Sequence, residues 1–244
     1  MRWKRFLFIM GGILVAEGFA LCGVCSKTPH RFDANSLTAS KPAYENREQK
    51  ACDIQREHND TLILVNIDNP LKQSYDADLR PICNGRLHAS RKLYKPLVKM
   101  LKDAGKKGFH FWIASAYRSR SKQQKLVDED VRKAQQSGLS YKEALRETYR
   151  ETMPAGHSEH ETGLALDILS SENYNMNTSQ EKEAGNIWLR NNCHRYGFIL
   201  RYPKNKEKIT GIRYEPWHFR YVGKKAATYM HKHKLTLEEF VKEG

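Results

Sequence analysis

The spacing of apolar and polar residues beyond residue 60 predicts a folded domain of mixed helices and strands. Short apolar or alternating runs predict strands at 61–66, 109–117, 163–169, 198–202 and 216–222. Apolar residues recur at helical spacing from Leu93 to Ala104, and Gly105 then ends the predicted helix. A second helical pattern covers 180–196 and ends at Gly197.

Three capping-box patterns mark further helix starts. In each, a serine or threonine is followed three residues later by Glu or Gln: Ser121 with Gln124, Ser140 with Glu143, and Thr236 with Glu239. They predict helices over about 121–136 and 140–152, and a short last helix. Because helices and strands mix without regular βαβ alternation, we expect an α+β fold with a small, mainly antiparallel sheet flanked by helices.

The first 60 residues lack such patterns. Arg2, Lys4 and Arg5 precede an apolar run, which Glu17 interrupts. Residues 1–25 therefore predict a signal peptide or an N-terminal signal anchor, with the domain outside the cell. No obvious cleavage site follows, which favours attachment to the cell membrane over secretion to the cell wall.

Residues 26–60 are polar and read as a linker, so the domain is expected over 61–244. Every motif with chemical content lies beyond Ser115. We therefore expect residues 1–60 to be dispensable for catalysis.

The net charge of the chain narrows the classes of molecule that it is expected to bind. The formal net charge is +14, which suits a polyanion such as an acidic cell wall. Basic residues are scattered and accompany no nucleic-acid-binding motif, so nucleic acid is not expected as a partner.

Cys52, Cys83 and Cys193 lie outside the apolar N-terminus and form no close pair in the sequence. Either one disulfide or free thiols would fit them.

The stretch GHSEHETGLALDI (156–168) carries candidate metal ligands. His160 and Asp167 are seven residues apart, a spacing that puts them on opposite faces of one continuous strand. Gly163 lies between them and can turn the chain, so that His160 folds back toward the face of Asp167. A carboxylate inside an apolar strand needs a partner, which a metal or an arginine would supply.

A second stretch, EPWHF (215–219), supplies the rest of a hydrolytic site. Glu215 and His218 are three apart, so a helical turn entered through Pro216 places both on one side. Two histidines and an aspartate would leave a fourth zinc position for water. A free carboxylate could then accept the proton of that water, whose pKa the metal lowers.

These motifs resemble the zinc D-alanyl-D-alanine carboxypeptidases of the VanY type, whose relatives include L,D-carboxypeptidases of the same fold. SAYRSRSKQ, GHSEHETGLALDI and EPWHFRYVG occur in the family's order and spacing, and TLILVNIDNPL and YGFILRYP are also similar. The resemblance spans roughly Leu62 to Phe240. It implies the zinc DD-peptidase, hedgehog-like fold and one Zn²⁺ per chain, bound by His160, Asp167 and His218.

The resemblance also implies roles for the surrounding residues. Glu215 would be the general base, and Arg118 would stabilise the carbonyl oxyanion or hold the substrate. The family pattern skips His157 as a ligand. Arg120 is expected to face solvent. The expected substrate contacts are Gln123, Ser158, Tyr117 and Trp217.

The sequence is thus interpreted as a monomeric, extracytoplasmic zinc metalloprotease. It would remove the C-terminal D-alanine from peptidoglycan stem peptides or their precursors. The helical stretch before GHSEH is the expected place for substrate selectivity. Two alternatives remain open. One is an L,D-carboxypeptidase or peptidoglycan endopeptidase of the same fold. The other is a non-catalytic cell-wall-binding domain, against which the retention of all four metal and base residues argues.

Overall fold

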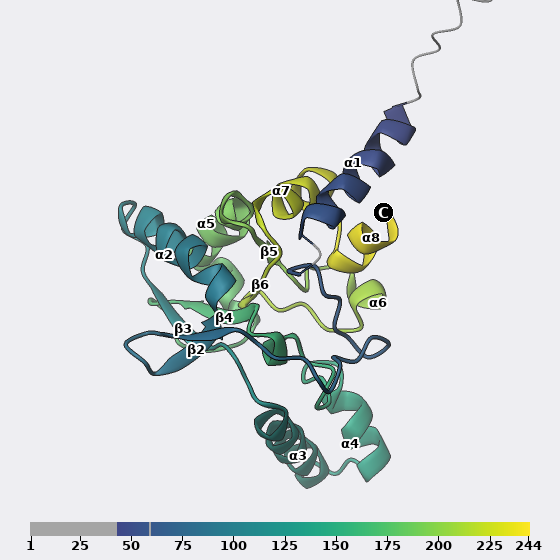
Figure 1. Cartoon of the computed structure of the whole chain (residues 1–244). Helices are drawn as coiled ribbons and strands as arrows, with labels where there is room; N and C mark the ends of the chain where they lie inside the picture. The colour runs from purple at the N-terminus through teal and green to yellow at the C-terminus, as the bar shows by residue number, and fades with distance from the viewer. Residues whose placement is uncertain (1–42, 59) are drawn as a thin grey trace, which may run out of the picture. The chain divides into compact units, whose positions relative to one another are not determined.

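The computed structural model describes residues 43–58 and 60–244, so the predicted signal or anchor segment lies outside the described residues. The described residues confirm the α+β fold (Figure 1). None of their helices is long and apolar enough to cross a membrane. The α-helices and strands are, in chain order, α1 (Ala43–His58), β1 (Leu79–Ile82), β2 (Leu87–Ser90), α2 (Arg91–Gly105), β3 (Phe111–Ser115), α3 (Arg120–Gln136), α4 (Tyr141–Thr148), β4 (Ala165–Ser170), α5 (Ala184–Asn192), β5 (Phe198–Leu200), α6 (Glu207–Thr210), β6 (His218–Tyr221), α7 (Lys224–His233) and α8 (Leu237–Lys242). Short 3-10 helices are η1 (Glu159–Thr162), η2 (Thr178–Lys182) and η3 (Cys193–Tyr196).

A four-stranded antiparallel sheet of order β3-β4-β6-β5 forms the centre of the domain. One of its faces packs against α2 and α5, through Leu93, Leu97 and Met100 of α2 and Leu189 of α5. This arrangement buries one face of the sheet and leaves the other for polar groups. The predicted strands at 109–117, 163–169, 198–202 and 216–222 all contribute to this sheet.

The predicted strand at 61–66 does not form. Its residues are apolar and β-branched, but their carbonyl groups do not pair with a neighbouring strand. Instead, the carbonyl oxygens of Thr61 and Ile63 accept hydrogen bonds from Nη2 of Arg220, at 3.0 and 2.8 Å. A buried guanidinium group therefore takes the place of a strand partner.

A hairpin of β1 and β2 lies in a region for which the sequence pattern predicted no strand. Its loop holds Cys83, Asn84 and Gly85 at positive φ angles of 52°, 56° and 86°. Cys83 is a free thiol, as are Cys52 and Cys193, so no disulfide joins the cysteines of the described residues.

The predicted helices form with some changes at their ends. Ser140 and Thr236 make the expected capping boxes, but α3 is capped by Ser119 instead of Ser121. The helix expected over 180–196 is divided into η2, α5 and η3, and Gly197 ends it in the left-handed conformation. Helices α3 and α4 pack together around a small cluster of their own, which contains Val127, Val131 and Ala144.

Helix α1 changes the predicted domain boundary. The sequence predicts a linker over 26–60, but residues 43–58 form this helix, which lies beside α7 and α8 (Figure 1). Ala51 and Ile54 are buried against apolar residues of both C-terminal helices, and Gln55 donates a 2.6 Å hydrogen bond to the carbonyl oxygen of Phe240. The folded domain therefore begins before residue 61.

We expect the substitution Ile54→Ala to lower the free energy of unfolding by roughly 2–4 kcal/mol, because it opens a cavity between α1 and the C-terminal helices. Lys50→Ala, at an exposed position of the same helix, should change it by less than about 0.5 kcal/mol. Urea unfolding of the two variants measures the difference. Equal stabilities would show that α1 adds nothing to the core.

Candidate active site

Gly163 turns the chain between the two candidate ligands of the first motif. It ends η1 with φ 72°, a conformation that side chains other than glycine rarely adopt. A Cβ atom there would lie 2.8 Å from Cδ2 of Leu79 and 3.0 Å from the backbone nitrogen of Ser90. The turn lets His160 of η1 fold back over β4, as the sequence predicts, and reach Asp167.

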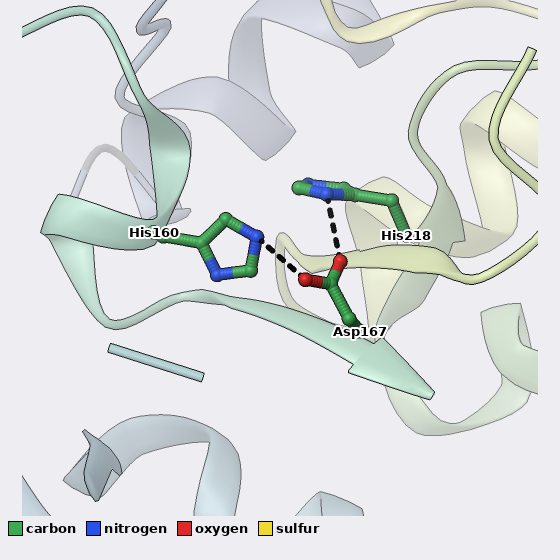
Figure 2. Close-up of side chains that lie close together, drawn as sticks. All are labelled: His160, Asp167 and His218. Atoms are coloured by element: carbon green, nitrogen blue, oxygen red, sulfur yellow. Dashed lines mark ion pairs between the residues drawn. The ribbon is translucent and has the colours of Figure 1, made fainter. Parts of the chain in front are cut away.

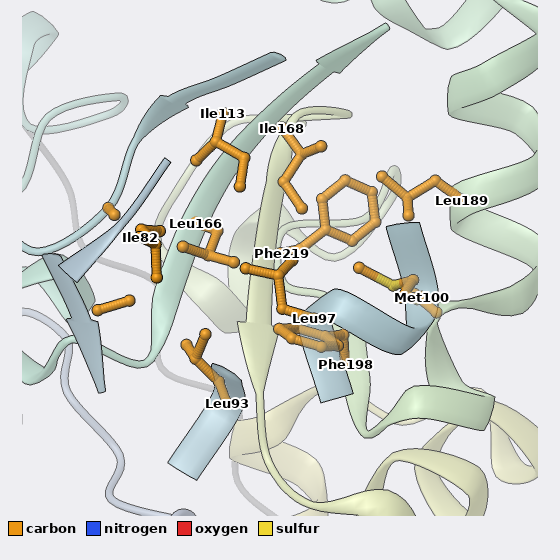
Figure 3. Packing of buried hydrophobic residues seen from close by; sticks show 13 residues of the cluster. Ile82, Leu93, Leu97, Met100, Ile113, Leu166, Ile168, Leu189, Phe198 and Phe219 are labelled. Carbon is orange, nitrogen blue, oxygen red and sulfur yellow. The ribbon is translucent and has the colours of Figure 1, made fainter. Parts of the chain in front are cut away.

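The pairing of β4 with β6 brings in the second motif. Asp167 is the register partner of His218, and Leu166 is the partner of Phe219. Because side chains alternate along a strand, Leu166, Ile168 and Phe219 fill the core (Figure 3), whereas Asp167 and His218 share the opposite face.

The three side chains meet in one buried cluster (Figure 2). Oδ2 of Asp167 lies 3.2 Å from Nε2 of His160, and Oδ1 lies 3.2 Å from Nδ1 of His218. One ligand atom from each residue lies within 4.8 Å of the others, and all three side chains are almost fully buried. Nε2 of His160 and Oδ1 of Asp167 have no hydrogen-bond partner among the described residues. Two imidazole nitrogens and a carboxylate are a donor set that fits Zn²⁺.

A tight turn holds Glu215 beside this cluster. The backbone nitrogen of His218 donates to the carbonyl oxygen of Glu215 at 3.2 Å, so the predicted helical turn is a single turn that leads into β6. The buried amide of Asn186 fixes it through a 2.8 Å bond to the carbonyl oxygen of Pro216. Oε2 of Glu215 lies 3.6 Å from Nδ1 of His218, and the side chain is nearly buried.

Burial and neighbouring charges shift the pKa values of these side chains in different directions. Burial raises the pKa of Glu215 to about 8. Burial and the charge of Arg118 lower the pKa of His160 to about 4, which leaves its ring neutral and able to bind a metal. Burial also disfavours charge on His218, but the carboxylates close to its ring, first that of Asp167, outweigh burial and raise the pKa of His218 to about 9. A bound cation would lower the pKa of both Glu215 and His218, because it repels their protons.

Arg118 is the basic residue nearest the cluster. Its Nη2 lies 3.6 Å from Oδ2 of Asp167, and its Nη1 donates a 3.0 Å hydrogen bond to Oε1 of Gln123. Gln123 is buried and also donates to the carbonyl oxygen of Met153 at 2.6 Å. Gln123 therefore orients Arg118, in addition to lining the cavity.

A cavity of about 700 Å³ opens over the cluster. Its wall includes all three candidate ligands, Glu215, Arg118 and three of the four predicted substrate contacts, Gln123, Ser158 and Trp217. Tyr117, the fourth, does not line it. Tyr117 follows the end of β3, where its backbone nitrogen donates a 2.9 Å hydrogen bond to the carbonyl oxygen of His88. His157 lies outside the cluster, with Nδ1 2.9 Å from the carbonyl oxygen of Asn66.

The sequence predicts that Arg120 faces solvent, but its guanidinium group is bound to other parts of the fold. Its Nε forms a 3.2 Å ion pair with Glu161, whose other oxygen accepts a 2.7 Å bond from the backbone of Gly156. The guanidinium group also donates to the carbonyl oxygen of Leu71 at 2.9 Å. Arg120 thus fastens the loop that carries His160 to an upstream segment.

Three residues near the cluster lie in the quoted motifs, but they were assigned no role from the sequence alone. Tyr202 lies with its ring 4.8 Å from that of His218 and lines the cavity. Glu159 and Arg201 are fully buried charged residues behind His218. The charges of Arg201 and Arg220 outweigh the effect of burial and hold the pKa of Glu159 well below its ordinary value. An arginine inside the apolar run FILRY was the signal that could have revealed this group.

Comparison with known proteins places these features in a family. The sequence model of VanY, D-alanyl-D-alanine carboxypeptidase, matches residues 86–224. A D-alanyl-D-alanine carboxypeptidase of Enterococcus faecalis (strain ATCC 700802 / V583) is 37% identical over 202 residues, which cover 81% of this chain and 73% of that protein.

Solved structures with the same fold agree with this assignment. VanYB in complex with D-alanine-D-alanine is 37% identical, with a TM-score of 0.68 over 75% of this chain and 97% of that one. A VanY variant from a VanB-type resistance cassette, in complex with Zn(II), is 36% identical, with a TM-score of 0.68 over 75% and 99%. The LD-carboxypeptidase LdcB is 35% identical, with a TM-score of 0.64 over 74% and 85%. On the strength of the family match and of the relatives that share most of its length, the chain belongs to the VanY family of D-alanyl-D-alanine carboxypeptidases.

Proposed function

We propose that this protein is a zinc-dependent carboxypeptidase that removes the C-terminal D-alanine from peptidoglycan stem peptides or their precursors. The observation that carries the proposal is the buried cluster of His160, Asp167 and His218, with Glu215 beside it, in the wall of one cavity. Membership of the VanY family supports the reaction, and the relative solved with D-alanine-D-alanine supports the substrate class.

The cluster is proposed to bind one Zn²⁺ through Nε2 of His160, a carboxylate oxygen of Asp167 and Nδ1 of His218, the atoms that face one another. A zinc ion with three protein ligands polarises a peptide carbonyl group and brings the pKa of a bound water to about 7. The remaining requirements are a proton acceptor and a partner for the charge that develops on the carbonyl oxygen.

Glu215 is proposed as the proton carrier. Its carboxylate takes a proton from the attacking water and later donates it to the amine that leaves as D-alanine. The proton stays on the carboxylate between the two steps. The turn through Pro216, held by Asn186, places the carboxylate beside the cluster, 3.6 Å from Nδ1 of His218.

Arg118 is proposed to stabilise the oxyanion. Its guanidinium group is almost buried, is oriented by Gln123 and borders the cavity next to Asp167. A fixed cation in such a site costs little reorganisation when charge develops. Ser158, whose hydroxyl makes no capping bond to η1, and Trp217 are proposed to contact the peptide.

Residues 1–25 are proposed to place the domain outside the cytoplasm, either as a retained membrane anchor or as a cleaved signal. The basic residues Arg2, Lys4 and Arg5 ahead of an apolar run support this orientation. Stem peptides of the cell wall are then within reach of the domain, which is proposed to act as a monomer.

Digestion of two defined stem peptides tests the reaction. The pentapeptide ending in D-alanyl-D-alanine should lose one D-alanine, and a zinc chelator should abolish the release until zinc is restored. The tetrapeptide, whose last bond joins an L-centre to D-alanine, should react much more slowly. Preferential cleavage of the tetrapeptide would instead establish the L,D-carboxypeptidase activity that the likeness to LdcB makes the main competitor.

Glu215→Gln should keep the fold and the bound zinc but lower kcat by roughly 10²–10⁴-fold, because an amide of the same shape cannot accept the proton. Glu129→Gln, at an exposed position of α3, is the matched control and should leave kcat unchanged. Steady-state kinetics with zinc analysis decides the matter. A Glu215→Gln enzyme with more than half of the wild-type kcat would exclude Glu215 as the base.

Arg118→Ala should lower kcat with little change in KM, because an oxyanion partner acts only in the transition state. A mainly raised KM would mean that Arg118 holds the substrate carboxylate in both states. Arg120 is tied to Glu161, so it is a poor control. Arg132→Ala removes an exposed guanidinium group from α3 and should behave like the wild type.

A further inference from the structure

Glu159 lies between the candidate metal ligands and a buried group of charged side chains. Its Oε1 accepts hydrogen bonds from Nε of Arg201 at 2.7 Å and from Nη1 of Arg220 at 2.6 Å. Its second oxygen, Oε2, lies 3.7 Å from Nε2 of His218. Oε2 of Glu159 and Nε2 of His218 are buried, and neither atom has a hydrogen-bond partner among the described residues.

The two histidines of the cluster present different nitrogen atoms to Asp167 (Figure 2). Nδ1 of His160 lies 2.7 Å from the carbonyl oxygen of Ala116, so it carries the proton and leaves Nε2 free to bind a metal. His218 is reversed: Nδ1 faces Asp167. When His218 binds a metal through Nδ1, the proton of its ring must be on Nε2. Nε2 faces Glu159. Histidine ligands usually donate this outer N–H to a carbonyl or carboxylate group, which fixes the ring and its tautomer.

We infer that Glu159 is the positioning residue for His218: its Oε2 accepts the Nε2–H proton and thereby selects the tautomer whose Nδ1 lone pair faces the metal position. The inference rests on the proposed zinc function. It assigns His218 a charged outer partner, whereas His160 has only a neutral carbonyl group.

The arginines hold the carboxylate of Glu159 in place for this role. Arg201 is itself held by two bonds to Glu238, at 2.9 and 2.6 Å. Arg220 is held by the carbonyl oxygens of Thr61 and Ile63. If Glu159 served only to neutralise the arginines, both of its oxygens would be expected to bond to them. One oxygen takes both bonds, and the other is left for His218.

Glu159→Gln separates the two roles. The amide oxygen can still accept from the arginines, but the amide NH₂ then faces Nε2 of His218 and favours a lone pair there, which is the wrong tautomer for zinc. We expect the zinc dissociation constant, measured by competition with a chelator on the full domain, to rise roughly 10–100-fold. His218→Ala, which lacks the ligand itself, gives the limit of full loss.

Glu239→Gln is the control, because it removes a carboxylate from the neighbouring residue of α8, whose partners are Lys206 and Thr236 and not the buried arginines. Its zinc affinity should stay close to that of the wild type. An equal loss in both variants, or no loss in Glu159→Gln, would overturn the inference while wild-type zinc binding upheld the proposed function. A wild-type protein that binds no zinc would overturn both.

A second measurement needs no variant that might fail to fold. Nitrogen-15 NMR of the histidine rings in the zinc-loaded wild-type protein should place the proton of His218 on Nε2 and that of His160 on Nδ1. A His218 ring with its proton on Nδ1 would overturn the inference.

Discussion

The antiparallel register that sets Asp167 opposite His218 is the constraint on which the rest of the site depends. A shift of β4 by one residue would send Asp167 into the apolar core and bring Leu166 or Ile168 to the polar face. The burial of Leu166 and Phe219 thus fixes the positions of two candidate ligands. The same packing that stabilises the sheet also determines the geometry of the metal centre.

Behind that face, the buried charges of Glu159, Glu238, Arg201 and Arg220 offset one another. Removing one member of such a group typically costs about 3–5 kcal/mol, because its partner is left buried and unpaired. The group also joins distant parts of the chain. It connects the segment at 61–63 and helix α8 with the residue that precedes His160.

The sequence predicts the centre of the molecule better than its edges. The alternating runs identify the four strands of the main sheet. The motifs at 156–168 and 215–219 identify the three residues that the turn at Gly163 and the pairing of β4 with β6 bring together. The sequence pattern does not reveal helix α1 because, among its described side chains (47–58), only Ala51 and Ile54 belong to the apolar cluster, too few for a visible stripe. The strand predicted at 61–66 fails because Arg220, far along the chain, binds its carbonyl groups. The hairpin of β1 and β2 did carry a signal, the dipeptide Asn84-Gly85 at its turn.

Helices α3 and α4 have an apolar cluster of their own, and α3 contributes Leu126, Asp130 and Lys133 to the wall of the cavity. Substitutions at these positions do not touch the residues that hold the cluster of His160, Asp167 and His218. Energetic effects at separate sites usually add. These three positions of α3 are therefore places where evolution, or a mutant library, can alter the wall of the cavity without altering the residues of the cluster.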